Sequence, residues 1–177
     1  GSFTALVGPS GAGKTSLLRV IAGLDGHQGG TVSIDGARVD NVNARDRNIG
    51  FVFQHYALFA HMTVAANIGF GLSIRPRRSR PGRAEIERRV AELLLDEPFG
   101  ALDPVVRRQI RGWLRDLHER LGLTTILVTH DRQEATELAD TIALMRHGRV
   151  VQTGTAQQLE DTPADPFVME FTGDVIR

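Results

Sequence analysis

The stretch that most constrains the fold is GPSGAGKT at residues 8–15. It has the form of a glycine, four further residues, and then glycine, lysine and a hydroxyl residue. Glycines at positions 8, 11 and 13 can adopt backbone conformations closed to other residues, so successive N–H groups can point inward. A phosphate group held on those N–H groups would sit at the positive end of the helix that follows.

The pattern therefore predicts the phosphate-binding loop of nucleotide hydrolases and kinases, in which Lys14 reaches the β- and γ-phosphates and the Thr15 hydroxyl ligates Mg²⁺. The residues predicted to bind nucleotide are Gly8, Pro9, Ser10, Gly11, Ala12, Gly13, Lys14 and Thr15. A short pattern of this kind also arises by chance. Here, however, residues 3–7 form an apolar, β-prone run, and residues 16–23 have helical spacing that ends in a glycine. Strand, loop and helix thus follow in the required order.

Composition excludes several classes of function. The chain has no cysteine, which rules out disulfides, zinc–thiolate sites and thiol catalysis. Its net charge is zero, so nothing draws it as a whole toward nucleic acid, and none is expected as a partner. No apolar run approaches the roughly 18 residues of a membrane span. Of the 21 basic residues, Lys14 is the only lysine, at the position where the loop requires a flexible ammonium group.

The rest of the chain alternates between strand-like and helix-like segments, which predicts a single α/β domain over residues 1–177 with a largely parallel sheet flanked by helices. Strands are expected at 31–36, 49–53 and 124–129, with a hairpin of 141–145 and 149–152. Helices are expected at 64–72, 84–94, 104–121 and 131–139, with two short ones within 155–177. The basic stretch at 75–83 is interpreted as a solvated loop, with binding of nucleic acid or lipid headgroups as the minor alternative.

Two predicted elements conflict near residue 93. The helical pattern of 84–94 and the buried strand of 93–96 need the same leucines, and no turn residue separates them. A helix that returns to a parallel sheet needs a connection of at least a couple of residues. The spacing therefore predicts that a segment is missing between about Glu92 and Leu95.

Four polar residues follow apolar strands and complete a candidate hydrolytic site. Asp96 and Glu97 end the run at 93–95, where one acid can hold Mg²⁺ and the other can orient or deprotonate the attacking water. Gln54 and His130 each end another strand, and ligands bind at that edge of an open α/β sheet. Taken singly, each has a plain structural reading, since a histidine after a strand is usually a cap or a satisfied core group. Together they predict catalysis.

These segments resemble the motifs of ABC-transporter ATPases. GPSGAGKT, FVFQHYALF at 51–59, LLLDEPFGALD at 93–103 and LVTHD at 127–131 are similar to the Walker A, Q-loop, Walker B with D-loop, and H-loop of that family. The resemblance implies Mg²⁺ on Thr15, Asp96 and Gln54. It also implies Glu97 as the base that activates water, His130 at the γ-phosphate, and Asp103 at a dimer interface.

The chain departs from the family pattern in two places. The LSGGQ-type signature and most of its helical subdomain, expected before residue 93, are absent, at the point where spacing alone suggests a gap. The family's first strands, with an aromatic residue that stacks on adenine, are also expected before residue 1. A chain without the signature could bind nucleotide but could not assemble two symmetric closed sites with a second copy.

The sequences of residues 53–72, 96–118 and 163–175 further resemble ATP-binding subunits of bacterial sulfate/thiosulfate importers, while subunits for molybdate, polyamines and sugars are similar. This resemblance implies an ATPase on the cytoplasmic face of the cell membrane, paired with a second ATPase subunit and bound to membrane subunits. The alternatives are a nucleotide-binding remnant that hydrolyses nothing usefully, and a small P-loop kinase. The kinase is disfavoured because the Asp-Glu pair and His130 point to activated water.

Overall fold

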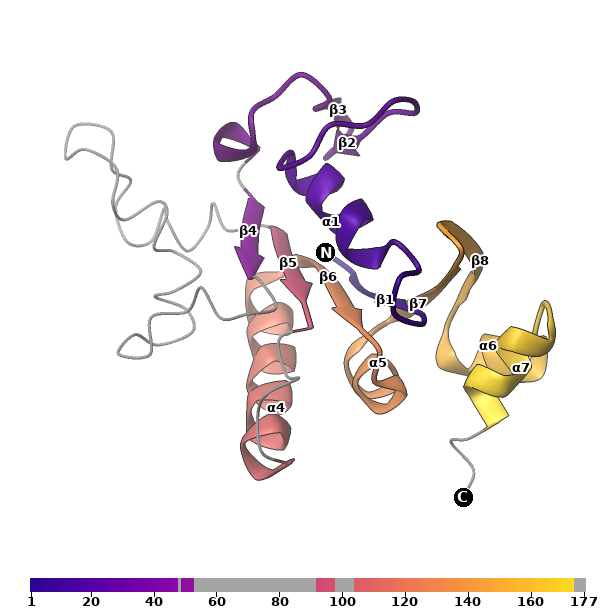
Figure 1. Cartoon of the computed structure of the whole chain (residues 1–177). Helices are drawn as coiled ribbons and strands as arrows, with labels where there is room; N and C mark the ends of the chain where they lie inside the picture. Colours follow the sequence, from indigo (N-terminus) through magenta and orange to yellow (C-terminus); the bar gives the residue numbers. More distant parts are fainter. Residues whose placement is uncertain (48, 53–91, 98–103, 174–177) are drawn as a thin grey trace.

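A six-stranded sheet forms the centre of the protein in the computed structural model, which describes residues 1–47, 49–52, 92–97 and 104–173 (Figure 1). The strands stand in the order β4-β5-β6-β1-β7-β8. Their bounds are β1 Phe3–Val7, β4 Ile49–Val52, β5 Glu92–Asp96, β6 Thr124–Thr129, β7 Thr141–Arg146 and β8 Arg149–Gly154. Neighbours from β4 to β7 pair in parallel, and β8 is antiparallel to β7. The predicted α/β class, largely parallel sheet and hairpin are confirmed.

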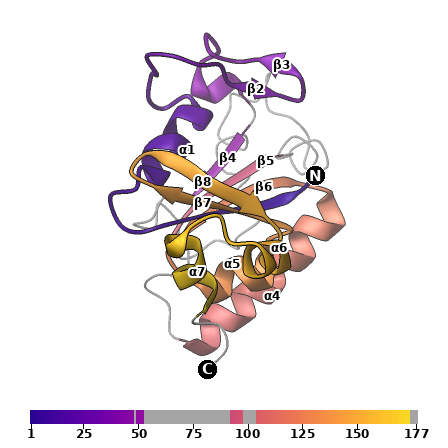
Figure 2. The same ribbon diagram turned by 90° about the vertical axis from the view of Figure 1, so that its right-hand side faces the viewer.

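Helices cover both faces of this sheet (Figure 2). Helix α1 (Lys14–Ala22) lies on one face, while α4 (Pro104–Leu121), α5 (Arg132–Leu138), α6 (Ala156–Asp161) and α7 (Pro166–Gly173) lie on the other. Side chains alternate across a strand, and β1 follows this rule. Leu6 packs with Leu18 of α1, whereas Phe3 on the opposite face packs with Leu114 of α4. The core is therefore two apolar layers separated by the sheet.

The helix ends follow the local sequence. Gly23 ends α1 in the left-handed region at φ 76°, and its N–H donates to the carbonyl of Val20. Asp131 caps α5, where its carboxylate accepts hydrogen bonds from the N–H groups of Gln133 and Glu134. Thr155 and Gln158 form a reciprocal capping box at α6. These signals explain why the bounds expected for the helices after residue 103 agree with the structure.

Two expected elements differ from the structure. The strand expected at 31–36 is reduced to β2 (Ser33–Ile34), which pairs with β3 (Ala37–Arg38) in a separate small ribbon. The helix expected over 84–94 is wrong at 92–94, which belong to β5. Those residues pair in register with β4 on one side and β6 on the other, so hydrogen bonds to two neighbouring strands outweigh the helical spacing. The helix expected at 64–72 and the basic stretch at 75–83 lie outside the described residues.

The parallel register brings three strand ends together. Val7 of β1 is level with Thr129 of β6, and Val128 is level with Asp96 of β5. The residues that follow these strands are Gly8, His130 and Glu97, which consequently meet at the carboxyl edge of the sheet. None of the helices within the described ranges combines the length and apolar composition needed to cross a membrane.

Candidate functional site

The phosphate loop is shaped by its glycines. Gly11 and Gly13 have φ values of 79° and 92°, in the left-handed region that glycine occupies without steric cost. Gly8 also has a positive φ, of 158°, and a Cβ there would lie 2.1 Å from the carbonyl oxygen of Met145 in β7. The loop is also fastened by the N–H of Gly148, which donates to the carbonyl of Ala12 at 3.0 Å. The β7–β8 hairpin thus packs against the phosphate loop at Gly8 and Ala12.

Lys14 folds back onto its own loop. Its Nζ donates to the carbonyl oxygens of Gly8 (2.7 Å) and Pro9 (3.0 Å), and only 6% of the residue is exposed. Burial lowers the pKa of the ammonium group, while the negative charges of Glu97 and Asp96 oppose that shift. The positive charge is therefore held inside the loop, where an incoming phosphate could replace the two carbonyl partners.

Thr15 and Asp96 face each other across the start of α1. The Thr15 hydroxyl donates to Oδ1 of Asp96 at 3.0 Å, and Asp96 is 3% exposed. Burial raises the pKa of Asp96 and the charge of Glu97 adds to that rise, whereas the hydrogen bond from Thr15 and the charge of Lys14 lower it. A hydroxyl and a carboxylate oxygen are thus placed side by side next to the phosphate loop.

Glu97 occupies an unusual backbone conformation. Its φ of 44° lies in the left-handed region, which non-glycine residues adopt rarely, and its N–H donates to the carbonyl of Val128 at 2.8 Å. The carboxylate lies 3.3 Å from Nδ1 of His130, measured to Oε2. The His130 side chain is 62% exposed and that of Glu97 is 19% exposed. An acid and an imidazole therefore meet at the solvent-facing side of the phosphate loop.

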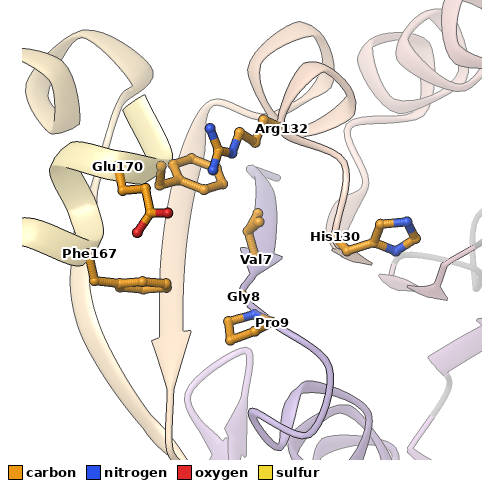
Figure 3. A pocket seen from close by; sticks show the side chains of 8 residues that line it. Val7, Gly8, Pro9, His130, Arg132, Phe167 and Glu170 are labelled. Carbon is orange, nitrogen blue, oxygen red and sulfur yellow. The ribbon is translucent and has the colours of Figure 1, made fainter. Parts of the chain in front are cut away.

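A pocket of about 220 Å³ lies beside this pair (Figure 3). One wall is the start of the phosphate loop, and another is α7. The guanidinium carbon of Arg132, from α5, lies 5.0 Å from the ring centre of Phe171 in α7. The imidazole of His130 points away from Phe167 and Glu170. The lining residues are Val7, Gly8, Pro9, His130, Arg132, Phe167, Glu170 and Phe171. His130 thus stands between the pocket and Glu97.

The residues predicted from sequence are largely brought together. Lys14, Thr15, Asp96, Glu97 and His130 all lie at one edge of the sheet. Gln54 and Asp103 lie outside the described residues.

Sequence reasoning missed the packing of the loop on Met145 and Gly148, and the buried Glu134 behind His130. For Gly148, the corresponding signal was the hairpin predicted from 141–145 and 149–152, which places this glycine in the turn. For Glu134, a charged residue on the apolar side of the helix expected at 131–139 was the corresponding signal.

Comparison with known proteins gives three findings. The sequence pattern of the family described as "ABC transporter" matches residues 1–154. The chain is 45% identical to the sulfate/thiosulfate import ATP-binding protein CysA 2 of Shewanella oneidensis, covering 99% of this chain and 60% of that protein. It is 46% identical to CysA of Photorhabdus laumondii, covering 99% of this chain and 59% of that one. The chain thus spans about three fifths of the length of these curated relatives.

The third finding concerns shape. A solved dimeric structure of the ATP-binding cassette MJ0796, in a post-hydrolysis state bound to ADP and phosphate, superposes with a TM-score of 0.69 at 26% identity. The match covers 87% of this chain and 85% of the cassette. A second dimeric structure of MJ0796, described as a bacterial ABC transporter cassette, gives a TM-score of 0.68 at 25% identity.

Proposed function

The chain belongs to the ABC transporter family, and from that premise we propose that it is an ATP-binding subunit of an importer. In this proposal it binds ATP in the phosphate loop, hydrolyses it, and energises uptake of sulfate or thiosulfate. The observation that carries the proposal is the meeting of Lys14, Asp96 and the Glu97–His130 pair at one edge of the sheet. The importer and its substrate are proposed from the similarity to the CysA proteins.

Each residue of the edge has a proposed role. The backbone N–H groups of residues 10–15 and the ammonium of Lys14 bind the β- and γ-phosphates, because they offer positive charge and donors at the start of α1. Glu97 takes the proton of the attacking water, since its carboxylate is the partly exposed acid at this edge. His130 lies 3.3 Å from that carboxylate and is proposed to contact the γ-phosphate.

Mg²⁺ fits the residues beside the loop. It prefers oxygen ligands, and Thr15 Oγ1 and Asp96 Oδ1 supply a hydroxyl and a carboxylate oxygen 3.0 Å apart. Within the described ranges no group of three or more His, Cys, Asp or Glu residues could hold a metal. This suits an ion that shares its coordination with phosphate oxygens rather than one caged by protein. Mg²⁺ would neutralise charge on the phosphates, and we propose Gln54 as a further ligand.

We also propose that the chain lacks an internal segment. Its alignment with CysA 2 extends over 213 positions, which is 36 more than the 177 residues of the chain. The proposed junction lies between about Glu92 and Leu95, and these residues belong to β5. The missing segment also gives the alternative function its basis: a nucleotide-binding remnant without the signature segment would bind ATP but would not turn it over.

We also propose the partners and the location of the chain. A second ATPase subunit is supported by the dimeric cassettes with a similar fold. Membrane subunits, and a place on the cytoplasmic face of the cell membrane, are supported by the import proteins that the chain resembles. Import of molybdate, polyamine or sugar remains the alternative substrate assignment.

The test is phosphate release from Mg-ATP by the purified chain. We expect turnover that is abolished by Lys14→Ala and Glu97→Gln and retained by Glu160→Gln, which removes an exposed carboxylate of α6 as a matched control. Binding of Mg-ATP without phosphate release in any variant would favour the remnant. Transfer of phosphate to a small hydroxyl compound would favour a kinase.

A further inference from the structure

The residues on both sides of His130 are held by one short chain of hydrogen bonds. The Thr129 hydroxyl donates to Oε2 of Glu134, and the same hydroxyl oxygen accepts a bond of 3.0 Å from the N–H of Asp131. Thr129 is 1% exposed and Glu134 is 4% exposed, whereas the His130 side chain between them is 62% exposed. The exposed His130 thus lies between Thr129 and Asp131, which are joined to each other and to the buried Glu134 by hydrogen bonds; we call Thr129, Asp131 and Glu134 the polar support.

The polar support joins the end of β6 to the start of α5. Thr129 is the last residue of β6 and is in register with Val7 of β1. Asp131 is the N-cap of α5, and its Oδ1 accepts from the N–H groups of Gln133 (2.8 Å) and Glu134 (3.2 Å). The hydrogen bond from the Asp131 N–H to Thr129 closes the turn between strand and helix. The backbone of His130 is therefore fixed at both ends.

A buried carboxylate such as that of Glu134 destabilises the folded state unless its lost hydration is compensated, so packing alone does not explain the residue. Burial raises the pKa of its carboxyl group, while the Thr129 hydroxyl and the positive charges of Arg107 and Arg111 act in the opposite direction. An apolar side chain of similar volume would pack this face of α5 without the cost of removing a carboxylate from water. A hydroxyl has one proton and two lone pairs, so donation to Glu134 leaves an oxygen lone pair available to the Asp131 N–H. The acid therefore sets the direction of the whole chain of bonds.

We propose that Thr129 and Glu134 are positioning residues that hold His130 within reach of the Glu97 carboxylate. The proposal rests on the proposed function, since it gives the pair a role only if Glu97 and His130 act on nucleotide. Neither residue touches the reacting atoms. Their effect passes through the turn at 129–131 to the 3.3 Å contact between His130 Nδ1 and Glu97 Oε2. Small displacements of a catalytic group cost large factors in rate, which is why such support matters.

The competing explanation is that the bonds only stabilise the junction of β6 and α5, and Thr125 provides the control for it. Thr125 lies on the same strand, is 0% exposed, and bonds through its hydroxyl to Nδ1 of His118 at 3.1 Å. Thr125→Val and Thr129→Val remove the same group from the same strand. They differ in whether the lost bond leads to His130.

The experiment compares pairs of variants by two readouts. Thr129→Val removes the hydroxyl and Thr129→Ser restores it, while Glu134→Met removes the acceptor oxygen and Glu134→Gln keeps one without the charge. The first readout is the NMR position of the His130 ring protons in the nucleotide-free chain, assigned with His130→Gln. The second is kcat and KM for Mg-ATP. We expect Thr129→Val and Glu134→Met to move the His130 ring signals and to lower kcat about tenfold or more with little change in KM. Thr129→Ser and Glu134→Gln should restore both toward the parent values.

Thr125→Val should leave the ring signals of His130 and the kinetic constants near those of the parent chain. The proposal is overturned if Thr129→Val and Glu134→Met leave the His130 signals where Thr125→Val leaves them. If Thr129→Val does not fold, the Glu134→Met and Glu134→Gln pair decides on its own. If the parent chain releases no phosphate, the proposed hydrolysis fails, and the ring signals still decide whether Thr129 and Glu134 position His130.

Discussion

The substitution Gly8→Ala tests whether the phosphate loop is built on the β7 backbone. The added methyl carbon would lie 2.1 Å from the carbonyl oxygen of Met145, about 1.3 Å closer than the 3.4 Å at which ordinary contact begins. That oxygen belongs to β7, which is paired with β1 on one side and β8 on the other, so moving it would disturb hydrogen bonds between strands. The loop has to shift instead.

The cost can be separated into two parts with a second glycine. Gly11→Ala also places a side chain at a positive φ, of 79°, but no atom lies within 4 Å of the added carbon. It should lose only the conformational cost of about 1–2 kcal/mol. Gly8→Ala adds overpacking, which typically costs about 1–3 kcal/mol more. That sum is a large share of the roughly 5–15 kcal/mol by which a domain is stable.

Urea unfolding followed by circular dichroism measures the difference. With a slope of about 2 kcal/mol per molar urea, the unfolding midpoint of Gly8→Ala should lie about 0.5–1.5 M below that of Gly11→Ala. Equal midpoints for the two variants, at equal slopes, would refute the contact between the loop and Met145 as a determinant of stability.

Lys14, Asp131 and Asp140 each provide a further test. Saturating Mg-ATP should protect Lys14 from an acylating reagent; because the chain has one lysine, intact mass reads the site directly apart from the N-terminus, and equal labelling with and without nucleotide would count against the loop. Asp131→Ala should lower the free energy of unfolding by about 1 kcal/mol because two N–H groups of α5 lose their cap, and an unchanged urea midpoint would contradict this. The Phe3 N–H and then Arg115 hold the pKa of Asp140 below its ordinary 3.8, so its stabilisation is present above that value and is lost as pH falls through the folded pKa. Asp140→Asn should therefore flatten the acid side of the stability curve below about pH 4, and an unchanged acid limb would argue against the interaction.

Much of the site could be predicted from sequence because its residues occupy the ends of strands. An apolar run that stops at a polar residue marks where a strand leaves the sheet, as at Asp96 and His130. In a parallel sheet such ends share one edge, so residues far apart in the chain gather without any knowledge of side-chain contacts. The glycines of the loop were readable for a similar reason, since positive φ values leave a direct trace in composition.

The rest depends on contacts that leave no local pattern. Nothing in the sequence around Gly8 indicates that its Cα lies against the carbonyl of Met145. The position of Glu134 on the apolar side of α5 marks that residue, but it does not specify the hydrogen bond with the Thr129 hydroxyl. The helix expected at 84–94 was wrong at 92–94 because leucines and a glutamate satisfy helical spacing as readily as a strand. Pairing with β4 and β6, which are distant in sequence, decides that choice.

The central claim is that this edge of the sheet hydrolyses ATP with Glu97 as the base. Its most direct test is a single-turnover experiment with the chain in excess over labelled Mg-ATP, which depends neither on product release nor on repeated cycles. We predict ADP and free phosphate from the parent chain, and intact bound ATP from Glu97→Gln. Intact ATP from both chains, or the same rate of phosphate release from both, would contradict the account.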